Sequence, residues 1–127
     1  MDETRARNVT ILVVEDYEDI LLTMRLTLEE QGYRILEASD GEQAVETAAR
    51  ERPDIILMDL HLPVLDGLSA TRRIRENPEL KNVIIVAVTA FQDQDNRAQA
   101  LAAGCNAFVS KPIDFDWLDG LLGNLLA

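Results

Sequence analysis

The sequence has 127 residues, which fits one domain, and its 23 acidic and 12 basic side chains give a net charge of −11. Affinity for nucleic acids depends on basic side chains that neutralise phosphates, so this charge argues against DNA or RNA as a partner. The longest uncharged apolar run, residues 83–91, is far shorter than the ~18 residues of a membrane helix. We do not expect the polar N-terminus to be a signal peptide, and the single cysteine, Cys105, leaves no internal disulfide. We therefore expect a cytoplasmic protein with no membrane partner.

The first half of the chain predicts two strand–helix pairs. Residues 9–14 form an apolar run typical of a buried parallel strand, and a weaker run at 33–38 alternates more with polar residues. The helix between them has apolar residues at helical spacing and a glycine at its C-terminal cap: Ile20, Leu21, Met24, Leu28 and Gly32. A second helix opens at Asp40 and Gly41 and ends at Arg52.

The second half predicts three more such pairs. Apolar runs at 55–58, 83–88 and 107–109 predict the strands. Asp66 caps the helix after the first of them, and Asn77 with Pro78 stops it. A further helix spans about 93–103 and ends at Gly104. The last helix contains several large apolar residues: Trp117, Leu118, Leu121, Leu122, Leu125 and Leu126.

A strand followed by a helix, repeated five times, predicts an α/β fold with a doubly wound parallel sheet, because crossover connections are right-handed. We expect this domain to cover residues 9–127, after a flexible tail at residues 1–8. These patterns leave the order of the strands open.

Polar side chains suited to ion and phosphate chemistry follow four of the five predicted strands. They are Glu15, Asp16, Asp59, Thr89, Ser110 and Lys111. Ligands of open α/β sheets bind at the carboxyl ends of the strands, so we expect these side chains to gather at one edge. Adjacent carboxylates crowd like charges unless a cation shares the site, and oxygen ligands suit Mg²⁺. His61 is the only histidine, which argues against a zinc cluster.

This mixture of groups suits phosphoryl transfer to a carboxylate. A carboxylate can attack phosphorus and form an aspartyl phosphate. The charge that develops on the phosphoryl oxygens needs cations and donors placed in advance. Mg²⁺, the ammonium of Lys111 and the hydroxyl of Thr89 would supply them.

In these segments the chain resembles the receiver domain of two-component response regulators, in particular single-domain regulators of the chemotaxis type. The matching segments are Val13-Val14-Glu15-Asp16, Leu57-Met58-Asp59-Leu60-His61-Leu62-Pro63, Leu65-Asp66-Gly67, Val88-Thr89-Ala90 and Phe108-Val109-Ser110-Lys111-Pro112. They follow one another in the family's order and spacing over nearly the whole chain. The resemblance implies a flavodoxin-like (βα)5 sandwich with strand order 2-1-3-4-5.

The resemblance also implies a role for each site residue. Asp59 would be the phosphoacceptor, and Mg²⁺ would be held by Glu15, Asp16, Asp59 and the backbone carbonyl of His61. Thr89, the backbone of Ala90 and Lys111 would contact the phosphoryl group, and Thr89 with Phe108 would form the switch pair. The peptide bond between Lys111 and Pro112 would be cis. The protein would then be no enzyme, but a regulator that assists its own phosphorylation and dephosphorylation.

The implied partners are proteins. A histidine kinase or a histidine phosphotransfer protein would supply the phosphoryl group. A downstream protein or a second copy of the chain would dock on the surface that begins at Phe91 and ends at Ala127. Some leucines of the last helix are expected to be exposed there, because they spread round more than one helical stripe.

Several other residues are interpreted structurally. Asp40 and Asp66 are expected to cap helices, Cys105 to be structural, and Trp117 to lie in the core. A cluster of arginines is expected on a solvated helix face: Arg72, Arg73 and Arg75. His61 is either an exposed loop residue or a contact to phosphate or water.

Three alternatives remain open. A phosphatase with an aspartyl intermediate would share the Mg²⁺ and the lysine, but its nucleophile normally follows the first strand, with a second acid two residues later, where this chain has His61. A flavodoxin-type FMN module would need a Ser/Thr/Gly-rich loop after the first strand, where Glu15 and Asp16 stand. A protein-binding module independent of phosphate would not need the complete site.

Overall fold

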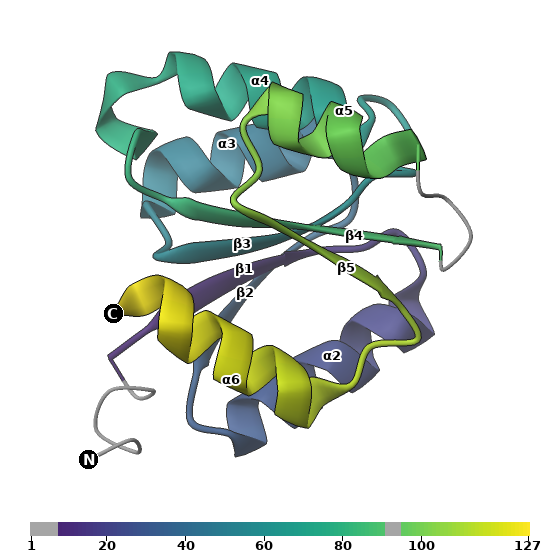
Figure 1. The fold of residues 1–127 in the computed structure, drawn as a ribbon, viewed down its shortest axis with the longest axis vertical. Helices are drawn as coiled ribbons and strands as arrows, with labels where there is room; N and C mark the ends of the chain where they lie inside the picture. The colour runs from purple at the N-terminus through teal and green to yellow at the C-terminus, as the bar shows by residue number, and fades with distance from the viewer. Residues whose placement is uncertain (1–7, 91–94) are drawn as a thin grey trace.

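The protein is a five-stranded parallel sheet between two layers of helices (Figure 1). The computed structural model describes residues 8–90 and 95–127. Of the expected tail at residues 1–8, only Asn8 lies in the described part, where it is exposed in a turn. No helix among the described residues is both long and apolar enough to span a membrane.

Strands and helices alternate along the chain as the sequence predicts. The strands are β1 (Thr10–Val14), β2 (Arg34–Ala38), β3 (Ile55–Asp59), β4 (Ile84–Ala90) and β5 (Ala107–Lys111). The helices are α2 (Glu18–Glu30), α3 (Gly41–Glu51), α4 (Gly67–Glu76), the short 3₁₀ helix η1 (Pro78–Leu80), α5 (Asp95–Ala103) and α6 (Phe115–Leu126). The strand order is β2-β1-β3-β4-β5 with every pair parallel, which confirms the order that the family resemblance implies.

Two apolar cores, one on each face, hold the sheet between its helices. Successive strand residues point to opposite faces, so Leu12 and Val14 face α3, α4 and α5, whereas Ile11 and Val13 face α2 and α6 (Figure 1). All four are at most 1% exposed. Because both faces are covered, the strands need no polar alternation, which is why they read as continuous apolar runs.

Side-chain caps begin two helices, and a glycine ends another, at the positions that the sequence indicates. Asp40 accepts a hydrogen bond from the amide of Gln43 (2.8 Å), and Asp66 accepts one from the amide of Ser69 (2.9 Å), so both acids are N-caps as expected. Gly32, at φ 102°, follows α2, where its left-handed conformation lets the next amides reach back to the last helical carbonyls.

The outer face of α6 differs from the prediction. Trp117, expected in the core, is 55% exposed. Leu118 and Leu122 are fully buried, and the other three leucines are partly buried, so the expectation of exposed leucines is wrong. The helix α6 has large apolar residues on more than one of its sides, so their periodicity alone does not identify its buried face.

Candidate functional site

The carboxyl ends of β1, β3, β4 and β5 bring the predicted polar residues to one edge of the sheet. The parallel register aligns Val14 with Met58, Asp59 with Val88, and Thr89 with Ser110. Glu15 and Asp16 follow β1 directly, and the Glu15 amide still pairs with a carbonyl of β2 (3.0 Å). The edge therefore collects three carboxylates, a hydroxyl and an ammonium.

Asp59 lies at the centre of this group. It is only 4% exposed, and both of its carboxylate oxygens accept hydrogen bonds. Oδ1 accepts from the backbone amide of His61 (2.8 Å), and Oδ2 accepts from Nζ of Lys111 (3.0 Å). One oxygen is thus fixed by the loop that follows β3 and the other by the end of β5.

Glu15 and Asp16 complete an acidic cluster around Asp59. Glu15 is 1% exposed, and its two oxygens accept from Nζ of Lys111 (3.2 Å) and from the amide of Tyr17 (3.2 Å). Asp16 is less buried overall, but its Oδ1 is shielded from solvent and has no hydrogen-bond partner among the described residues. One oxygen from each of Glu15, Asp16 and Asp59 lies within 4.8 Å of the others.

The cluster shifts the pKa values of its members. Burial raises the pKa of Glu15, and the charge of Asp59 raises it further, against the opposing hydrogen bonds from Tyr17 and Lys111. Burial alone would lower the pKa of Lys111, but its hydrogen bonds and charge interactions with Asp59 and Glu15 outweigh burial and raise it. Lys111 therefore stays an ammonium, while Glu15 bears an electrostatic cost when it ionises.

These residues fit a divalent, oxygen-binding cation. Three carboxylates beside one ammonium leave a formal charge of −2 at the sheet edge. The buried Asp16 Oδ1 has lost its contact with water, and no hydrogen bond from the described residues compensates for this. Hard cations such as Mg²⁺ take oxygen ligands of this kind.

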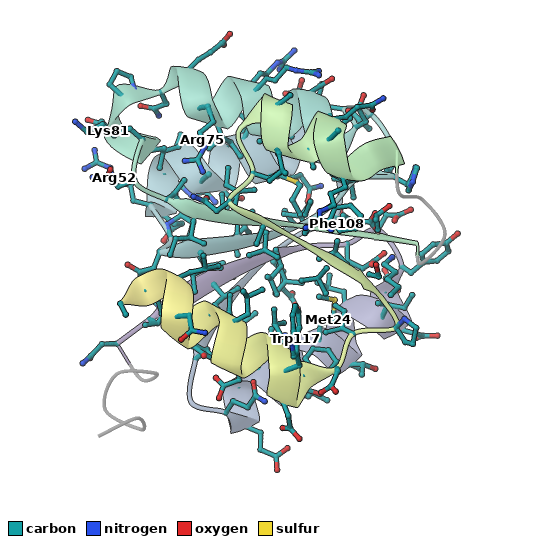
Figure 2. The ribbon with its side chains drawn as sticks, in the orientation of Figure 1. Met24, Arg52, Arg75, Lys81, Phe108 and Trp117 are labelled. Carbon is teal, nitrogen blue, oxygen red and sulfur yellow. The ribbon has the colours of Figure 1, made fainter. Side chains whose placement is uncertain are left out.

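Of the predicted switch pair, Thr89 lies near this edge, in register with Ser110, and Phe108 lies further inside the sheet, in register with Ala87. Thr89 is fully buried, and its Oγ1 has no hydrogen-bond partner among the described residues. Phe108 is partly buried and packs against the core on the α3–α5 side of the sheet (Figure 2). A phenylalanine side chain has no hydrogen-bond donor or acceptor, so any coupling between Thr89 and Phe108 would work by packing.

The loop between β3 and α4, residues 60–66, has a strained turn that the sequence did not predict. The amide of Leu65 donates to the carbonyl of Pro63 (2.7 Å), which closes a three-residue γ-turn. Its central residue, Val64, has φ 68° and is 79% exposed. Positive φ at a β-branched residue is rare and costs on the order of 1–3 kcal/mol.

Comparison with known proteins identifies the family of the chain. The profile of the response regulator receiver domain matches residues 11–122. The chain belongs to the response regulator receiver domain family. Receiver domains are phosphorylation-activated switches of two-component signalling rather than classical enzymes, and they interact with histidine kinases or phosphotransfer proteins and with downstream targets.

Individual relatives agree with this assignment. This receiver domain is 36% identical over 104 residues to the polar-differentiation response regulator DivK of Brucella anthropi, which is 82% of this chain and 85% of DivK. It is also 36% identical over 104 residues to the response regulator PleD of Caulobacter vibrioides, but that match covers only 23% of PleD. The receiver domain of the sensor histidine kinase PA1611 from Pseudomonas aeruginosa PAO1 is 42% identical, with a TM-score of 0.86 over 93% of this chain and 97% of that one. Its crystal structure has a magnesium ion coordinated in the active site cleft.

The structure brings most of the predicted site residues together. Glu15, Asp16, Asp59 and Lys111 form one cluster, and the peptide bond between Lys111 and Pro112 is cis. The side chain of His61 is exposed, and it is its backbone amide that touches Asp59. The expected start of the output surface, residues 91–94, lies outside the described residues.

Proposed function

We propose that Asp59 accepts a phosphoryl group from a histidine kinase or a histidine phosphotransfer protein, with Mg²⁺ bound by the acidic cluster. The observation that carries this proposal is the placement of Asp59, a nearly buried carboxylate held by Lys111 and the His61 amide beside two further acids. A carboxylate oxygen of Asp59 forms the new bond to phosphorus as the bond from phosphorus to the donor's histidine nitrogen breaks. The nitrogen leaves with the electron pair and takes up a proton.

The other residues of the edge prepare the site for this transfer. Glu15, Asp16, Asp59 and the His61 carbonyl would hold Mg²⁺, which would neutralise charge on the phosphoryl oxygens. Lys111 already contacts Asp59, and its ammonium is placed to bind a phosphoryl oxygen. The same groups would assist attack by water when the aspartyl phosphate is hydrolysed.

Thr89 and Phe108 would couple the phosphoryl group to the rest of the domain. The unpartnered hydroxyl of Thr89 would donate to a phosphoryl oxygen, together with the backbone of Ala90, which lies in register with Lys111. A shift of Thr89 would free space that Phe108 then fills. The affected surface contains α5, β5 and α6, where a downstream protein or a second copy would bind.

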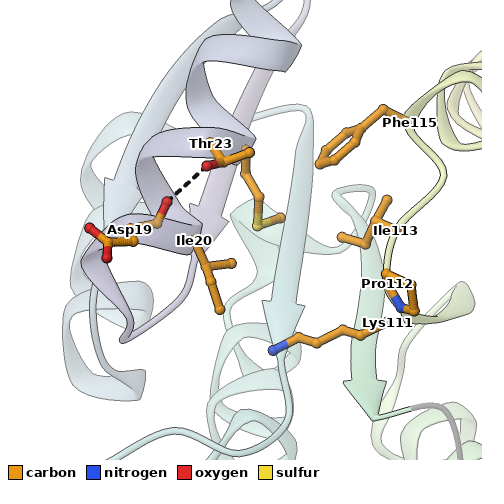
Figure 3. A pocket seen from close by; sticks show the side chains of 8 residues that line it. Asp19, Ile20, Thr23, Lys111, Pro112, Ile113 and Phe115 are labelled. Atoms are coloured by element: carbon orange, nitrogen blue, oxygen red, sulfur yellow. Dashed lines mark hydrogen bonds between the residues drawn. The ribbon is translucent and has the colours of Figure 1, made fainter.

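A groove beside the acceptor suits the approach of the donor. Ile20 of α2 faces Ile113 and Phe115 across an apolar groove of about 640 Å³, with Lys111 at one end (Figure 3). Lys111 also contacts Asp59, so a donor helix lying in the groove would carry its histidine close to the acceptor. We place this exchange in the cytoplasm, as the sequence predicts.

Mass spectrometry of the intact protein separates this function from its alternatives. After incubation with acetyl phosphate and Mg²⁺, we expect one added phosphoryl group that persists long enough to be weighed. Rapid release of free phosphate without a labelled species would instead indicate a phosphatase. An unchanged mass without release of phosphate would contradict the proposal and favour FMN binding or a module that binds partners without phosphate.

A further inference from the structure

Two glycines that begin helices fit against the backbone at the end of β3 and in the loop that follows it. A Cβ atom on Gly67, the first residue of α4, would lie 2.2 Å from the carbonyl oxygen of Asp59. A Cβ atom on Gly41, the first residue of α3, would lie 1.8 Å from the carbonyl oxygen of Leu65. Both distances are far inside van der Waals contact, so each helix start touches backbone where only glycine fits.

Gly41 is the unexpected member of this pair, because α3 follows β2, and neither element contributes a residue to the site. The start of α3 is nonetheless fixed. Asp40 caps its first turn through the amide of Gln43 (2.8 Å), and the Asp40 carbonyl accepts from the amide of Ala44 (3.0 Å). A methyl group on Gly41 would therefore have to be accommodated by the loop, since the capped helix end resists movement.

The loop can move most easily at the turn around Val64. Leu60 and Leu62 are buried and anchor its first part, whereas Val64 is exposed at the strained turn. His61 lies between the two anchors, and its amide holds Oδ1 of Asp59. Leu62 separates His61 from the turn, so a displaced Leu65 would reach the His61 backbone by pulling on Leu62, which at 9% exposed is the less buried of the two anchors.

We propose that Gly41 is a positioning residue for the phosphorylation site. Its missing side chain lets the start of α3 fit against the Leu65 carbonyl, and this contact holds the loop so that the His61 backbone faces Asp59. Gly41 itself touches neither the acceptor nor the acidic cluster. The proposal rests on the function proposed for Asp59, which it deepens by naming what orients the backbone beside the acceptor.

The test compares Gly41→Ala with Gly120→Ala, a matched control on α6 where an added Cβ meets nothing within 4 Å. The first measurement is the His61 amide in ¹⁵N-resolved NMR spectra of the metal-free protein. In Gly41→Ala we expect its resonance to shift and its exchange with solvent to accelerate. We also expect Mg²⁺ affinity and the rate of phosphorylation by acetyl phosphate to fall by about tenfold or more, since small misplacements cost this much. The control should match the wild type in all four quantities.

The outcomes distinguish the two proposals. A merely structural role for Gly41 would lower the melting temperature but leave the His61 amide and the Mg²⁺ affinity of the folded protein unchanged, and this result would overturn the inference. The NMR measurement needs no phosphoryl group, so it remains informative if wild-type Asp59 is never labelled, which would defeat the proposed function instead.

A second variant covers the case in which Gly41→Ala does not fold. Val64→Gly allows the turn to move, because glycine accepts φ 68° and other backbone conformations without strain. The double variant Gly41→Ala/Val64→Gly should therefore fold, with the His61 amide still displaced. A double variant that remains unfolded would show that the loop does not absorb the contact, and would contradict the proposal.

Discussion

At the scale of single residues, the buried carboxyl of Glu15 carries an electrostatic cost when it ionises in the metal-free protein. Burial raises its pKa above the ordinary value of 4.5, so the folded protein holds this proton to a higher pH than the unfolded chain does. Stability is therefore lost as the pH rises from the unfolded pKa through the folded one. At neutral pH, the charge on Glu15 destabilises the metal-free protein.

Replacing this charge gives a prediction whose sign depends on Mg²⁺. Glu15→Gln should raise the free energy of unfolding of the metal-free protein at pH 7 by on the order of 1 kcal/mol, since the cost of ionisation disappears. The gain should vanish below about pH 4.5, where Glu15 is protonated in both states. With Mg²⁺ present, the wild type should gain more stability than the variant, because ligand binding stabilises the folded state.

Urea unfolding with and without Mg²⁺ at several pH values measures these differences. The matched control is Glu46→Gln on the exposed face of α3, which should change neither the pH profile nor the response to Mg²⁺. A Glu15→Gln protein that is less stable than the wild type at pH 7 without metal would show that the ion pair with Lys111 outweighs burial.

At the scale of elements, Arg75 joins the end of α4 to both ends of the β4–α5 unit. Its guanidinium donates to the Gly104 carbonyl (2.9 Å), to Oδ1 of Asn106 (2.7 Å) and to the carbonyls of Leu80 and Lys81 (3.3 Å each) (Figure 2). Burial lowers its pKa. The prediction of a solvated arginine cluster is therefore wrong for this member, while Arg72 and Arg73 are exposed.

Replacement by alanine distinguishes the partly buried Arg75 from the exposed Arg73. Arg75→Ala should lower the free energy of unfolding by about 1–3 kcal/mol, because it removes the side-chain donor of the part-buried Gly104 carbonyl. Arg73→Ala, which removes an exposed ion pair to Glu42 (2.8 Å), should cost about 0.2–1 kcal/mol. Chemical denaturation of both variants checks this, and equal losses would mean that Arg75 is no more than a surface charge.

At the scale of the whole molecule, the sequence predicts the features that follow from the order of strands and helices. It does not predict close contacts between segments that are distant in the sequence. Glu15, Asp59 and Lys111 could be placed together because parallel strands end at one edge of the sheet. The contact of Gly41 with Leu65 could not be predicted, because it joins the start of α3 to the loop between β3 and α4. The exposure of Trp117 was missed because α6 is apolar on most of its surface.

The proposed switch predicts a change that spreads from the site toward one side of the domain. Beryllofluoride, which substitutes for the phosphoryl group, should alter amide hydrogen exchange in β4, α5, β5 and α6, because Thr89 moves toward the ligand and Phe108 fills its space. Thr89→Ala should bind the ligand with little change outside the site. Changes confined to α2 and α3 in the wild type would place the output surface elsewhere.

The proposed transfer requires Asp59 as the acceptor, and labelling of the variant Asp59→Asn tests this requirement. An amide is a poor nucleophile, so this variant should keep the fold but gain no phosphoryl mass from acetyl phosphate and Mg²⁺. The control, Asp40→Asn, removes an acid of the same type at a helix cap that asparagine also fills, and it should be labelled like the wild type. Labelling of Asp59→Asn at the wild-type rate would contradict the assignment of the acceptor.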